Sequence, residues 1–260
     1  MAVNLDYLLH LADNALVLGQ RNAEWCGHGP ILEEDIAMAN IGLDHIGQAR
    51  LLYQHVASQM GGETTEDRLA YFRNPEEFRN YVLLELPHRT AFAPSAAVER
   101  DYAVTVARNF LYSSLMLLLW EALQNSKDAQ LAAIAAKSLK EVRYHLRHSS
   151  SWMLRLGDGT ALSHARMQAA LDYLMPYTQE FWASSKMETA ACQAGVGADV
   201  GALRERWQAS VDQVLTEATL ALPGAKGHVT RGKDGVHSEH LSYLLAEMQG
   251  LARAHPEAVW

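Results

Sequence analysis

Carboxylates and histidines at helical spacing are the residues of this chain best suited to chemistry. Asp44 stands beside His45, and Glu141 lies four residues before His145. Residues three or four apart share one face of a helix. In di-iron carboxylate bundles, two helices each supply a Glu-x-x-His pair and two others supply single glutamates. These residues therefore suggest a di-iron centre.

The ligand set around these residues is incomplete. Gly47 stands three residues after Asp44, where the pattern requires histidine, and Val142 stands three residues before His145, where it requires glutamate. The single carboxylates are expected about 30 residues before each pair, at positions that hold neutral side chains. The six positions of this degenerate site are Asn14, Asp44, Gly47, Ser113, Val142 and His145.

Two interpretations of these residues differ in whether the chain binds metal. Iron requires several carboxylate ligands, so we expect no metal in this chain. Asp44, Glu141 and His145 would then be buried polar residues that pair with one another or with the neighbouring Lys140 and Arg143. The alternative is an independent di-iron carboxylate oxidase that uses Asp13, Asp44, Glu141 and His145.

A second pair of histidines, His237 and His240, follows a glycine-rich loop. Their spacing is compatible with metal binding, but such scattered residues beside a loop more often cap a helix and meet solvent. We expect this structural, non-ligand role here.

The elements that must position these residues are helices. The chain contains only seven prolines and long stretches rich in Ala, Leu, Glu, Gln and Met. We predict helices over residues 5–26, 32–60, 96–124, 128–156, 163–192, 199–222 and 238–254, with Ser163 and Asp199 as N-caps. A long, partly helical connection over 69–94 separates the first two helices from the next two.

This connectivity predicts the fold class. A helical hairpin, a long link and a second hairpin are typical of ferritin-like bundles. We therefore predict an all-α, ferritin-like four-helix bundle with a long crossover between hairpins and additional C-terminal helices. The whole chain, 1–260, would be one domain, with its core bundle over about 5–156 and accessory helices over about 163–254.

Apolar stripes predict which helix faces are buried. In the helix over 32–60, apolar residues recur at steps of three and four and are expected to face the bundle core. These residues are Leu32, Ile36, Ala39, Leu43 and Ile46. A similar stripe on the helix over 128–156 includes Leu131, Ile134, Ser138, Val142, His145, Ser149 and Trp152.

Composition excludes several classes of protein. The formal charge is -8, with 30 acidic and 22 basic residues among 260, which disfavours nonspecific binding to nucleic acid. Two cysteines, Cys26 and Cys192, make no disulfide framework and suggest a reducing compartment. The N-terminus lacks the features of a secretory signal, and the densest apolar run, Leu115–Trp120, is too short to span a bilayer. We expect a cytoplasmic protein with neither nucleic-acid nor membrane partners.

Several longer motifs resemble the family of C subunits of bacterial phenylacetyl-CoA epoxidases, over nearly the whole chain. They are Glu24–His28, Ile36–Asp44 with Gly47–Arg50, Ala135–Lys137 with Lys140, Glu141 and Arg143–Arg147, and His237–Leu241 with Ala246–Gln249.

This resemblance implies a structural, non-catalytic subunit of a multicomponent monooxygenase complex in aerobic phenylacetate degradation. It implies a homologous catalytic subunit that carries the di-iron site, a further small subunit, and a reductase with flavin and iron–sulfur groups that delivers NADPH-derived electrons. The subunit itself is expected to hold no cofactor. The complex is expected to epoxidise the aromatic ring of phenylacetyl-CoA.

The resemblance also implies that phenylacetyl-CoA lies close to this subunit. The expected contacts are Glu77, Phe78, Arg79, Asn80, Thr189, Ala190 and Ala191. Arg79 either contacts a phosphate or is a solvated surface arginine.

Overall fold

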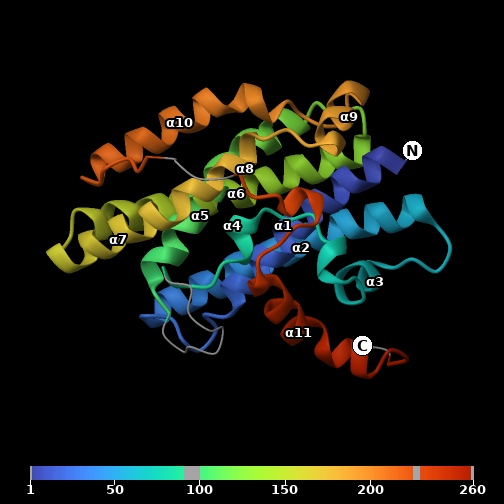
Figure 1. Ribbon diagram of the computed structural model, residues 1–260, viewed down its shortest axis with the longest axis horizontal. Helices are drawn as coiled ribbons and strands as arrows, with labels where there is room; N and C mark the ends of the chain where they lie inside the picture. The colour runs from blue at the N-terminus through green and yellow to red at the C-terminus, as the bar shows by residue number, and fades with distance from the viewer. Residues whose placement is uncertain (1, 91–99, 225–228, 259–260) are drawn as a thin grey trace. The chain divides into compact units, whose positions relative to one another are not determined.

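The computed structural model describes residues 2–90, 100–224 and 229–258, and in these ranges the chain is all-α (Figure 1). The described residues contain no β-strand, and Arg231 and Val236 form an isolated antiparallel bridge. A helical hairpin, a long connection, a second hairpin and further helices follow one another along the chain. The predicted all-α, ferritin-like fold class is confirmed.

The chain divides into two compact units, of residues 1–87 with 231–260 and of residues 88–230. The helices of the first are α1 (Ala2–Ala23), α2 (Leu32–Met60), α3 (Glu66–Tyr71), η1 (Pro75–Glu77), α4 (Val82–Glu85), η3 (Gly232–Asp234) and α11 (Glu239–Ala254). Those of the second are α5 (Tyr102–Leu123), α6 (Ala129–Gly157), α7 (Ala161–Leu174), η2 (Met175–Thr178), α8 (Gln179–Trp182), α9 (Lys186–Ala194) and α10 (Val200–Glu217). The single domain over 1–260 stays a prediction.

In the first unit, α1 and α2 pack side by side as the first hairpin (Figure 1). Two glycines allow this close approach. A Cβ added at Gly19 would lie 3.2 Å from the Gly42 carbonyl oxygen, and one at Gly42 would lie 3.3 Å from the Gly19 carbonyl oxygen. Any side chain at either position would push the two backbones apart.

The predicted core face of α2 is wrong. The stripe expected inside the bundle is largely exposed: Leu32 is 72%, Ile36 54%, Leu43 66% and Ile46 38% exposed. The buried face of α2 instead carries Glu34, Met38, Ile41, Gly42, His45, Gln48, Ala49, Leu52, Tyr53 and Val56. Periodicity identifies an apolar face but does not show which neighbour covers it, and here the glycine-containing face packs against α1.

In the second unit, α5 and α6 form the second hairpin, and Asp128 caps α6 by accepting a hydrogen bond from the backbone N–H of Leu131. In the described chain, α5 is the one helix long and apolar enough to cross a membrane by length and composition, but 94% of its apolar window is buried. Such burial is typical of the core helix of a globular protein. The stripe predicted on α6 is buried except for Trp152, which is half-buried.

The single helix predicted over 163–192 is wrong. The chain there forms α7, η2, α8 and α9, because Pro176 interrupts the α-helical hydrogen bonds and Ser185 begins a new helix as its N-cap. Ser163 is not the N-cap of α7; Thr160 is, and Ser163 completes a reciprocal capping box with it. Asp199 caps α10 as predicted.

Candidate functional site

Asp13 is the buried carboxylate of α1, and its oxygens are occupied by donors from the first unit. It forms an ion pair with Arg73, accepts a hydrogen bond from Tyr53 Oη at 2.5 Å and accepts one from the backbone N–H of Arg79 at 2.8 Å. Burial, and then the Asp13 carboxylate, raise the pKa of Tyr53 well above its usual value. This carboxylate anchors the chain and is not arranged to bind a metal ion.

Arg73 holds the connection after α3 against α1. Its Nε donates to the Leu69 carbonyl at 2.6 Å, its Nη1 donates to the Glu77 carbonyl at 2.9 Å, and its guanidinium stacks 4.2 Å from the centre of the Phe78 ring. Burial lowers the pKa of Arg73, but Asp13, Tyr53 and Glu77 together more than offset this effect, so the net shift is upward. Arg73 therefore stays charged beside Asp13.

Asn14 and His10 fasten the next part of the same connection. The Asn14 side-chain carbonyl accepts from the backbone N–H of Tyr81 at 2.8 Å, and His10 Nδ1 donates to the Arg79 carbonyl at 2.6 Å. Polar residues on one face of α1 thus satisfy backbone groups that would otherwise be buried without partners.

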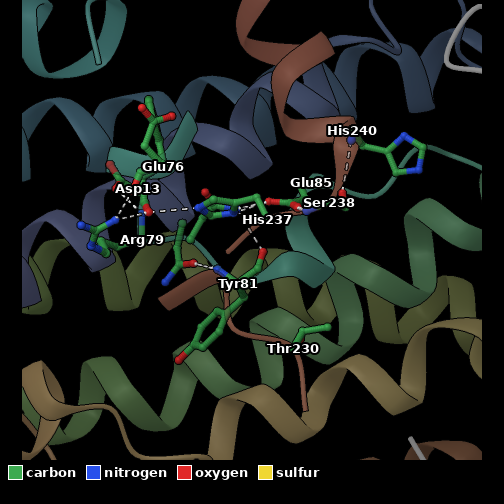
Figure 2. A network of polar contacts seen from close by, with 12 residues as sticks. Asp13, Glu76, Arg79, Tyr81, Glu85, Thr230, His237, Ser238 and His240 are labelled. Atoms are coloured by element: carbon green, nitrogen blue, oxygen red, sulfur yellow. Dashed lines mark hydrogen bonds and ion pairs between the residues drawn. The ribbon is translucent and has the colours of Figure 1, made fainter. Parts of the chain in front are cut away.

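A second buried carboxylate, Glu85, holds the segment that leads into α11. It accepts from Asn80 Nδ2 at 2.9 Å, His237 Nδ1 at 2.8 Å and the backbone N–H of Ser238 at 2.5 Å. Figure 2 shows His237 and Glu85 directed toward one another beside Ser238. His237 Nε2 also lies 3.0 Å from the Phe78 carbonyl, so both ring nitrogens donate only when the imidazole carries its second proton.

The histidine pair before α11 is only partly as predicted. Ser238 caps the helix, but the side chain of His237 is 4% exposed and His240 is buried. The expected solvent exposure is wrong, because Glu85, some 150 residues earlier in the chain, supplies a buried acceptor for His237.

The inward register of α2 also differs from the expected one. Asp44 is half-buried, and a Cβ added at Gly47 would meet nothing within 4 Å, whereas His45 is buried. The inward i,i+3 pair is therefore Gly42 and His45.

This pair matches the one on α6, where Val142 and His145 are both buried. Each hairpin keeps the histidine of a Glu-x-x-His pattern and lacks the glutamate. The signal in the sequence is that His45 and His145 each stand three residues after a residue that is not a carboxylate, and Asp44 beside His45 favoured the other register.

The remaining positions of the degenerate site carry no buried carboxylate on α5 or α6. Glu141 forms an ion pair with Lys137 at 2.7 Å and is partly exposed, so the full burial expected for it is wrong. The hydroxyls of Ser113 and Ser138 are buried and have no hydrogen-bond partner among the described residues.

These residues do not fit a di-iron centre. Such a centre requires inward carboxylates from four helices, and no group of three or more His, Cys, Asp or Glu suited to a metal ion occurs in the described ranges. The donor that α1 offers, Asp13, is already neutralised by Arg73.

The first segment expected to contact CoA begins at Glu77, the last residue of η1, and continues into the loop before α4. Phe78 and Asn80 are fully buried and engaged within the unit. Glu77 is exposed and caps the backbone N–H of Asn74, while the half-buried Arg79 donates to the carbonyls of Glu76 and Phe78 (Figure 2). Within this segment, the side chains of Glu77 and Arg79 are thus the ones accessible to a ligand.

The second expected segment lies on α9. Thr189 is exposed, Ala190 is half-buried and Ala191 is buried. Thr189 lines a cavity of about 230 Å³ together with Ser184, Glu188, Cys192, Gln193, Ala198, Asp199 and Val200. This segment belongs to the second unit, whereas residues 77–80 belong to the first.

Comparison with known proteins gives a consistent result over nearly the whole chain. A family model described as phenylacetic acid catabolic protein matches residues 2–260. The chain is also 43% identical over 254 residues to the C subunit of 1,2-phenylacetyl-CoA epoxidase from Escherichia coli (strain K12), and the alignment covers 98% of each protein. The chain therefore belongs to the phenylacetic acid catabolic protein family.

Proposed function

We propose that this protein is a structural, non-catalytic subunit of a phenylacetyl-CoA epoxidase that acts in phenylacetate degradation. The observation that carries the proposal is that the inward-facing positions of α2 and α6 lack the carboxylates that a di-iron site requires. His45 and His145 follow Gly42 and Val142 where glutamates would be required. Asp13, on α1, is held by Arg73 and by further hydrogen bonds.

In this proposal the chemistry belongs to the partners. A homologous catalytic subunit holds the di-iron centre, and a reductase with flavin and iron–sulfur groups supplies electrons from NADPH. The complex, which is cytoplasmic, also includes a further small subunit. The protein described here stabilises the catalytic subunit and helps to frame the site for the CoA ester.

The polar network of the first unit supports this framing role. Asp13 and Glu85 fix the connection over residues 73–85 through buried charged hydrogen bonds, so the backbone that carries Glu77 and Arg79 is held in one conformation. On the second unit, Thr189 offers a hydroxyl beside the α9 cavity. These surface side chains are the proposed contacts to phenylacetyl-CoA.

Metal analysis of the purified chain tests the proposal. We expect no stoichiometric iron in the chain alone, and iron together with ring-epoxidising activity only when the catalytic homologue is co-expressed. Two irons per chain with oxygen-dependent turnover would instead establish the independent oxidase that uses Asp13, Asp44, Glu141 and His145. Asp44→Ala should leave the metal content of the complex unchanged.

A further inference from the structure

The second helix of the first unit, α2, carries an exposed apolar stripe. Its residues are Leu32, Ile36, Ala39, Leu43 and Ile46, and the steps between them are four, three, four and three residues. This alternation is the heptad pattern by which one helix packs along another. The four large side chains are 38–72% exposed.

Most of the buried packing of α2 is not made by the stripe, although Ile46 at its edge lies next to Gly19 of α1. The opposite face of the helix packs against α1, with Gly19 and Gly42 in close approach and Ile41 and Leu52 buried. A row of large apolar side chains that contributes little to the fold marks a surface for another polypeptide.

Charge around the stripe restricts the kind of helix that fits it. Three carboxylates along the stripe, Glu33, Asp35 and Asp44, are at least partly exposed, and residues 29–49 contain no Lys or Arg. The next residue, Arg50, is exposed and forms an ion pair with Glu66. A second copy of this chain laid on the stripe would bring this acidic surface against itself, which opposes association. Basic residues beside an apolar seam would instead complement it.

We propose that the α2 stripe binds a helix of a different subunit, and that this helix presents an apolar heptad seam flanked by Lys or Arg. The inference rests on the proposed function, because the homologous catalytic subunit is the polypeptide expected to supply that helix.

Substitution of Leu43, at the centre of the stripe, tests this surface. Leu43→Glu places a charge on a side chain that is 66% exposed, so the fold should be retained. The matched control is Leu162→Glu, at a position on α7 that is 65% exposed. We expect wild type and Leu162→Glu to co-purify with the co-expressed catalytic homologue, and Leu43→Glu to lose it, with thermal unfolding of all three chains unchanged.

A second variant tests the charge argument. Glu33→Lys with Asp44→Lys should weaken association with the same homologue by about tenfold or more, because like charges then face each other across the seam. Binding that is unchanged by this double substitution contradicts a basic-flanked partner helix.

The remaining outcomes separate this inference from the proposed function. If Leu43→Glu still co-purifies with the homologue, the docking surface is wrong while the subunit role stands. If wild type alone is a dimer that Leu43→Glu converts to a monomer, the occupant is a second copy and the inference is overturned. Failure of wild type itself to co-purify, or two irons per chain, rejects the proposed function.

A separate experiment tests whether residues of the same chain cover the α2 stripe. In a Cys26→Ser, Cys192→Ser background, a thiol introduced by Leu43→Cys should react rapidly with a maleimide in the chain alone and slowly in the complex. A thiol that is already protected in the chain alone would show that the protein covers its own stripe, and would overturn the inference.

Discussion

The two helical hairpins, α1–α2 and α5–α6, each bury a histidine on the second helix and differ in the polar residues of the first helix. In both, the second helix buries a histidine, His45 or His145, three residues after a residue that cannot bind metal. On the first helix they diverge. On α1, Asn14 is buried and accepts a hydrogen bond from the backbone N–H of Tyr81 in the following connection. On α5, Ser113 is buried and has no hydrogen-bond partner in the described chain.

This difference shows that a buried carboxylate and a buried hydroxyl place different demands on their surroundings. A buried carboxylate persists only when it is paired, so Asp13 is retained together with Arg73. A small neutral hydroxyl has a much smaller desolvation cost, so Ser113 needs no counterion. The polar residues of α1 anchor the connection that follows α3, whereas Ser113 on α5 is buried without a hydrogen-bond partner in the part of the chain that the structure describes.

The largest expected effect follows from removing the counterion of Asp13. Arg73→Met leaves this carboxylate buried and uncompensated and should lower the free energy of unfolding by about 3–5 kcal/mol. Denaturant titration measures the change. The control is Arg50→Met, whose exposed ion pair with Glu66 should contribute less than about 1 kcal/mol. Equal costs for the two variants would show that the α1 anchor is unimportant.

Asn14→Ala tests the second anchor of the first hairpin. It leaves the buried backbone N–H of Tyr81 without its acceptor and creates a small cavity. We expect a loss of about 2–3 kcal/mol in the free energy of unfolding. Amide hydrogen exchange should also accelerate at Tyr81. Unchanged exchange at that amide would contradict the anchoring role.

Alkaline pH probes the apolar core of the second unit. Burial raises the pKa of Tyr112, so above pH of about 10 the unfolded chain releases this proton while the folded chain keeps it, and stability falls as pH rises. Between pH of about 9 and 11.5, wild type should lose about 2 kcal/mol more stability than Tyr112→Phe. Parallel pH profiles for the two proteins would place the Tyr112 phenol in contact with solvent.

The smallest effect is expected at the hydroxyls of the second hairpin. Ser113→Ala and Ser138→Ala remove buried groups without hydrogen-bond partners among the described residues. Each should change the free energy of unfolding by less than about 0.5 kcal/mol, or stabilise the protein slightly. A loss above about 1 kcal/mol at either position would reveal a polar partner and erase the contrast with Asn14.

Local signals in the sequence predicted much of the fold. The predicted end of α2 at about Met60 is confirmed, since Gly61 stops the helix, and Asp199 caps α10 as predicted. The helix predicted over 163–192 failed because Pro176 and the capping box of Ser185 act together to break it. The incomplete ligand set was visible from the residue types, but its register on α2 was not.

By itself, the amino-acid sequence determined the helical class, the hairpin connectivity and the shortage of carboxylates, because these depend on residue types and short-range spacing. Only the tertiary structure decided which face of α2 is buried, that Arg73 neutralises Asp13, and that His237 meets Glu85. Such pairings join residues 60 to 152 positions apart, and no local pattern encodes them. The apolar stripe of α2, which was predicted to lie in the core, therefore lies on the surface.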